Sequence, residues 1–111
     1  MLLKELSDEA LALLLAWMRV IVRADGAFSS SERATVLRIQ EEVGKERFLQ
    51  AMKRAEGYED VEKLKEFSKR FEGDEEKKLI FNTLEMIAKG DGISVEEDAA
   101  LRWLGAWWRL R

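Results

Sequence analysis

The 111-residue chain contains no cysteine, no histidine and no proline. Without cysteine it forms no disulfide and has neither a thiol nucleophile nor a thiolate metal ligand. Without histidine it lacks the commonest general base and the commonest transition-metal ligand. Because proline is absent, no position is barred from a helix. The absence of cysteine and histidine removes several kinds of catalytic group and metal ligand, whereas the absence of proline leaves the fold open. We expect no enzymatic activity.

The chain also lacks a strong excess of one charge and a long apolar run. It has 19 basic and 22 acidic residues, a formal net charge of −3, and so no electrostatic basis for binding nucleic acid. Its longest apolar run, from Ala10 to Met18, is too short to span a bilayer. The charged residues that flank this run are unlike those of a signal peptide. We therefore expect a cytoplasmic protein.

Residues that suit amphipathic helices are abundant. Hydrophobic residues make up 47% of the chain and charged residues 37%, which suits one folded domain over residues 1–111. Apolar residues recur at helical spacing between glycines, which readily end helices. The pattern predicts six helices, at about 8–24, between Ser29 and Gly44, at 45–56, 60–71 and 75–89, and from Ser94 toward the C-terminus. We expect a compact all-α bundle, with Ser7 and Asp74 capping the first and fifth helices.

The loop after the first predicted helix is repeated after the fifth, with one residue fewer. The aligned pairs are Asp25 with Asp91, Gly26 with Gly92, Ser29 with Ser94, and Glu32 with Glu97. In each copy a glycine ends one helix, and Ser-x-x-Glu is typical of a capping box that opens the next. The repeat predicts two pseudo-symmetric helix-loop-helix halves.

The first loop matches the second half of a calcium-binding EF-hand loop, with Asp25-Gly26, Phe28 and Glu32 at the expected spacings. The first half is missing, because Ile21 and Arg23 stand where two oxygen ligands are needed, so we exclude a true EF-hand. Two interpretations remain. The acids of both loops could share one divalent cation, calcium or magnesium, with carbonyls and water completing the shell. Alternatively, these side chains only satisfy turns and cap helices.

The doubled pattern of an apolar helix, Asp-Gly and Ser-x-x-Glu resembles the tellurite-resistance TerB-like family, which includes the N-terminal domain of certain DnaJ-like co-chaperones. The resemblance rests on Ala24-Asp25-Gly26 with Glu32 and on Gly90-Asp91-Gly92 with Glu97, and it covers nearly the whole chain. It implies an all-helical bundle, a link to tellurite or general stress response, and a metal-binding role for Asp25, Glu32, Asp91 and Glu97. The chain departs from the family in its shorter second loop and in Gly90, where alanine is usual.

The last predicted helix is rich in tryptophan. Leu101, Leu104 and Trp108 share one face, which we expect in the core, and Trp103, Trp107 and Leu110 share another. Trp and Arg are enriched in interface hot spots, so the second face predicts a surface for a protein partner or a homodimer. The residues of this predicted interface are Trp103, Trp107, Arg109 and Leu110. Simple core packing and a membrane-surface role are the alternatives, the latter disfavoured because few cations flank the aromatic residues.

Two functions follow from these observations. The first is a non-catalytic TerB-like domain that binds a divalent cation at its Asp-Gly loops and docks a protein partner in a stress response. The second is an interaction or homodimerisation module that binds no metal and uses its Trp-rich last helix. A hydrolase with two metal ions is less favoured, because the loops offer too few ligands.

Overall fold

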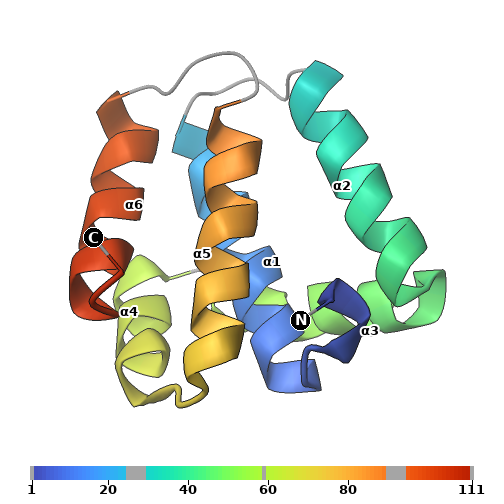
Figure 1. Ribbon diagram of the computed structural model, residues 1–111, viewed down its shortest axis with the longest axis horizontal. Helices are drawn as coiled ribbons and strands as arrows, with labels where there is room; N and C mark the ends of the chain where they lie inside the picture. The colour runs from blue at the N-terminus through green and yellow to red at the C-terminus, as the bar shows by residue number, and fades with distance from the viewer. Residues whose placement is uncertain (1, 25–29, 59, 90–94, 111) are drawn as a thin grey trace.

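The computed structural model describes residues 2–24, 30–58, 60–89 and 95–110, and for 22–24, 30–32 and 95–97 it describes the backbone alone. A short 3-10 helix, η1 (Leu3–Glu5), precedes six α-helices in these ranges (Figure 1). The helices are α1 (Asp8–Ala24), α2 (Ser30–Val43), α3 (Lys45–Glu56), α4 (Val61–Arg70), α5 (Asp74–Ala88) and α6 (Val95–Trp107). The described ranges contain no strand, and the expected all-α bundle is confirmed.

Helix α1 lies at the centre because its sequence is apolar nearly all round. Leu11, Leu13, Leu14, Leu15 and Trp17 are at most 1% exposed. The helix packs against α3, α4, α5 and α6, so each of its faces meets a different neighbour. Burial of this much apolar surface on a single helix contributes favourably to the stability of the fold.

The helix ends follow the start and stop signals of the sequence, with one difference at α5. Asp60 caps α4 by accepting a hydrogen bond from the Glu62 N–H at 3.0 Å. Asp74, however, is the first residue of α5, and Gly73 with a φ of 133° takes the N-cap position. Val61, the first residue of α4, is 38% exposed, because the buried residues of this helix are Leu64 and Ser68.

The two halves of the chain differ in how their helices pack. Helices α5 and α6 pack against each other and against α1. Helix α2 instead packs on η1, α3 and α5, at the edge of the molecule opposite α6 (Figure 1). The pseudo-symmetry of the sequence therefore extends to the order of the helices but not, over the described residues, to their contacts.

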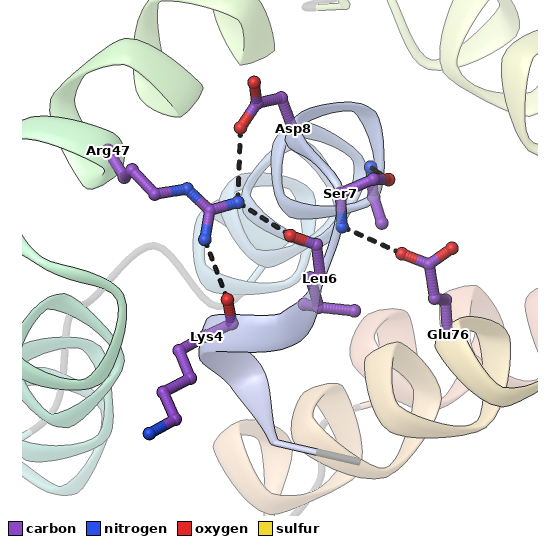
Figure 2. Close-up of polar contacts among 7 residues, drawn as sticks. Lys4, Leu6, Ser7, Asp8, Arg47 and Glu76 are labelled. Carbon is purple, nitrogen blue, oxygen red and sulfur yellow. Dashed lines mark hydrogen bonds and ion pairs between the residues drawn. The ribbon is translucent and has the colours of Figure 1, made fainter.

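The N-terminal segment is tied to α3 and α5 by side chains from far along the chain (Figure 2). The Arg47 guanidinium of α3 donates to the carbonyl oxygens of Lys4 and Leu6, at 3.0 and 2.7 Å, and forms an ion pair with Asp8 at 3.2 Å. The Ser7 hydroxyl caps α1 by accepting from the Ala10 N–H at 3.1 Å. These contacts hold η1 against the N-terminal end of α1.

The N-terminal end of α1 is also capped from α5. The Ser7 N–H donates to the Glu76 carboxylate at 2.9 Å (Figure 2). In a capping box this carboxylate comes from the third residue of the same helix. Here that position is Ala10, and Glu76 of α5 supplies the acceptor instead.

The described residues form one body with one core. Their buried apolar side chains make a single cluster, and the radius of gyration of 12.7 Å is that of a compact domain of this length. Within these ranges no helix combines the length and the apolar character needed to cross a bilayer.

Candidate functional site

Helices α4 and α6 meet along a line of stacked side chains. Trp103 and Trp107 lie one turn apart on α6, with ring centroids 6.1 Å apart and planes within 7° of parallel. The Nζ atoms of Lys65 and Lys69 lie 5.1 and 5.0 Å from the centroids of Trp103 and Trp107 respectively. We call these four residues the aromatic seam. Because the lysines are also one turn apart, each ammonium group covers one ring in a cation–π contact.

The inner end of the aromatic seam is anchored in the core. The ring of Trp103 packs against Trp17 of α1, with centroids 5.8 Å apart. The Trp17 indole N–H donates to the hydroxyl of Ser68 at 2.9 Å, and the Trp108 indole N–H donates to the carbonyl oxygen of Ser68 at 3.1 Å. Ser68 of α4 thus accepts hydrogen bonds from Trp17 of α1 and from Trp108, the residue that follows α6. The spacing between α4 and α6 is fixed by this network.

Exposure increases toward the outer end of the seam. Trp103 is partly buried, whereas Trp107 is 49% exposed. Lys69 is exposed and also forms an ion pair with Glu66 at 3.7 Å. Trp107 therefore presents part of a large amphipathic ring to solvent, while the Trp103 ring and the Lys69 ammonium group contact it. A restricted aromatic ring loses little entropy on binding, which is favourable for an interface hot spot.

The other two residues of the predicted interface lie where α6 ends. The Leu110 N–H donates to the Gly105 carbonyl at 2.8 Å, as in a Schellman motif. Arg109 takes the positive φ of 58° that glycine usually supplies in this motif. Its side chain is exposed, whereas Leu110 is partly buried against the core. Arg109 is thus accessible to a partner, and Leu110 mainly closes the helix end.

The four acids predicted to bind a cation lie outside the described residues. This holds for Asp25 and Asp91 entirely, and for the side chains of Glu32 and Glu97. The helix ends that flank both Asp-Gly loops, those of α1, α2, α5 and α6, lie at the same end of the bundle (Figure 1). Elsewhere in the described part of the chain, no three His, Cys, Asp or Glu side chains are grouped to hold a metal ion.

The lysines of the aromatic seam were not singled out by the sequence. They lie in a stretch of mixed charge, where alternating acids and bases are typical of a solvated helix face. Only the i,i+4 spacing of Lys65 and Lys69, which matches that of Trp103 and Trp107, hints at a contact. That signal is weak, because the helical period makes such spacings common in a charged helical protein.

A groove of about 250 Å³ lies between η1, α2 and α5. Its apolar lining includes Leu2 and Met86, which are 54% and 58% exposed, and its polar lining includes Arg38 and Glu42. The contacts of Arg47 and Glu76 fix the N-terminal wall of this groove (Figure 2). The titratable side chains of this lining are Arg38 and Glu42, which lie one turn apart on α2.

Comparison of the chain with protein-family models, with curated proteins and with solved structures gives no significant match.

Proposed function

We propose that this chain is a non-catalytic binding domain of the TerB-like type that docks a protein partner through the aromatic seam and Arg109. The observation that supports it most is the half-exposed Trp107, stacked on Trp103 and covered on one side by Lys69. Trp and Arg are enriched in interface hot spots, and Trp107 and Arg109 are the exposed residues of these types at this end of α6. The absence of cysteine and histidine is consistent with a binding role.

The link to tellurite or general stress response comes from the sequence resemblance alone. It rests on the two Asp-Gly loops and is independent of the aromatic seam. The docking role can therefore be tested without reference to tellurite.

Replacing Trp107 with alanine is expected to weaken partner binding by about tenfold or more, because an exposed aromatic anchor is lost while the core is kept. The partner is first identified by a photo-crosslinking residue at the exposed position 106, next to Trp107, in the tagged full chain, and is then purified and titrated by calorimetry.

Leu49→Ala is the matched control, since Leu49 is an exposed apolar residue of α3 with 55% exposure, away from the seam. This variant should retain the affinity of the original chain. A Trp107→Ala variant that binds the partner as tightly as the original chain would refute docking at the seam.

We propose as a second function that Asp25, Glu32, Asp91 and Glu97 together bind a divalent cation, calcium or magnesium. The position of all four flanking helix ends at one end of the bundle favours this proposal (Figure 1). Hard cations prefer carboxylate oxygens, and loop carbonyls and water would complete the shell.

Calcium or magnesium at one hundred times its dissociation constant is expected to stabilise the fold by about 2.7 kcal/mol. Calorimetry and thermal unfolding, with manganese and zinc for comparison, measure the effect. The Asp25→Asn/Asp91→Asn variant should lose it, since two of the four carboxylates become neutral.

The matched control for charge is Glu56→Gln/Glu62→Gln, which removes two exposed acids elsewhere in the bundle. This variant should keep the stabilisation. Absence of both heat and thermal stabilisation at millimolar ion would leave the metal-free interaction module as the remaining function.

A further inference from the structure

Helix α2 lies at the edge of the bundle, with one face packed and the other open (Figure 1). Ile39 and Val43 are buried against its neighbours η1, α3 and α5, and Val36 is partly buried. The exposed side chains among residues 33–43 are Arg33, Ala34, Leu37, Arg38, Glu41 and Glu42. A large apolar side chain, Leu37 at 58% exposure, therefore lies near the middle of a face whose other exposed residues are four charged side chains and Ala34.

The charges on this open face are segregated along the helix. Arg33 and Arg38 precede the acids, and the last turn contains Glu41 and Glu42 but no basic residue. A helix dipole favours the opposite order, with acids near the N-terminus and bases near the C-terminus. The two acids in the last turn are therefore unfavourable for the isolated helix. They become favourable beside a second helix that runs in the opposite direction with the same sequence.

We propose that α2 is a self-association surface, on which the α2 of a second copy of this chain packs antiparallel. A twofold axis at Leu37 brings the two leucines together. It also places Arg33 of each copy opposite Glu41 of the other, because the two residues lie four positions on either side of Leu37. The same patch then serves on both copies, as an isologous dimer requires. The antiparallel helix dipoles add to the favourable electrostatics.

The size of the contact sets the strength of this dimer. Helix α2 has 14 residues and is about 21 Å long, so one helix from each copy forms a small interface. Interfaces at the small end of the range belong to weak complexes. We expect a dimer with a dissociation constant in the micromolar range or above. Leu37 is its apolar centre, and the charges select the orientation.

Sedimentation equilibrium of the full chain across a wide concentration range tests the dimer. The Leu37→Asp variant should dissociate at a concentration at least about tenfold higher, because it loses an apolar contact and places two acids at the axis. Leu49→Asp, at a similarly exposed leucine of α3, should leave the association unchanged. A chain that stays monomeric at millimolar concentration, or a dimer that Leu37→Asp does not weaken, would overturn the proposal.

Charge reversal tests the charge pairing between the two copies. Arg33→Glu/Arg38→Glu makes the open face of α2 acidic, and Glu41→Arg/Glu42→Arg makes it basic. Each variant alone should be monomeric, whereas an equimolar mixture should form a heterodimer that is lost when both copies also carry Leu37→Ser. Self-association of either variant at the original strength, or a mixture that remains monomeric, would contradict the charge pairing between the copies.

A cross-linking experiment locates the axis. The chain has no cysteine, so Leu37→Cys introduces one thiol that should meet its own copy at the axis. Mild oxidation is expected to give a covalent dimer of this variant and little or none of Leu49→Cys. Equal yields from the two positions would contradict the proposal. Circular dichroism confirms folding of each variant, and all of the replaced side chains are exposed.

Discussion

Replacing Trp17 with alanine is expected to lower the free energy of unfolding by about 3–5 kcal/mol. Trp17 of α1 is 1% exposed and packs against α4 and α6, where it contacts Trp103 and donates a hydrogen bond to Ser68. Its removal leaves a cavity that three helices must share. A domain of this size is stable by only about 5–15 kcal/mol. Denaturant unfolding followed by circular dichroism measures the loss.

Trp107→Ala is the matched control for the same side chain in the same fold. Trp107 is half exposed and stacks on Trp103 without entering the core. We expect its loss to cost about 1 kcal/mol or less, in the range of an aromatic pair contact. Equal losses at positions 17 and 107 would contradict the assignment of Trp17 to the centre of the core.

Replacing Ser68 with alanine is expected to cost about 1–3 kcal/mol. Ser68 is fully buried, and its hydroxyl accepts from the Trp17 indole and donates to the Leu64 carbonyl at 2.8 Å. Alanine fits the site but leaves the buried indole N–H without an acceptor. An unsatisfied buried donor costs more than the hydrogen bond itself contributes. Denaturant unfolding again gives the magnitude.

A double-mutant cycle separates this hydrogen bond from packing. Trp17→Phe removes the donor, so Ser68→Ala in that background should cost clearly less than in the original chain. Thr83→Val is a control, because the Thr83 hydroxyl donates only to the Leu79 carbonyl of its own helix among the contacts of the described residues, at 2.7 Å. Strict additivity of the Trp17 and Ser68 variants would show that the hydrogen bond contributes nothing measurable.

The helices themselves could be predicted because each depends on local information. The third predicted helix coincides with α3, Lys45–Glu56, since Gly44 and Gly57 bound it on both sides. Gly44 has a φ of 93°, which a glycine adopts without strain. The core face of α6 was also predicted, and Leu101, Leu104 and Trp108 are all buried. Helical periodicity predicts which face of a helix is buried.

Periodicity does not predict against which other helix the buried face packs. The Ser68 contacts of Trp17 and Trp108 join residues 51 and 40 positions apart, and Glu76 caps α1 from 69 positions away. The sequence is equally compatible with a role for each of these residues within its own helix. From the sequence alone, Lys65 and Lys69 are expected on a solvated helix face. Their contacts with Trp103 and Trp107 follow only from the position of α6 beside α4. The arrangement of the candidate site therefore depends on the packing of the whole bundle.

The central position of α1 has a consequence for the order in which the chain is made. Ribosomes add about 5–20 residues per second, so several seconds pass between the completion of α1 and that of α6. Because α3, α4, α5 and α6 all cover α1, this helix has no complete set of neighbours until the last of them has left the ribosome. During that interval its leucines and Trp17 are available to a chaperone or to another nascent chain. The helix that is synthesised before the others is the last to be fully enclosed.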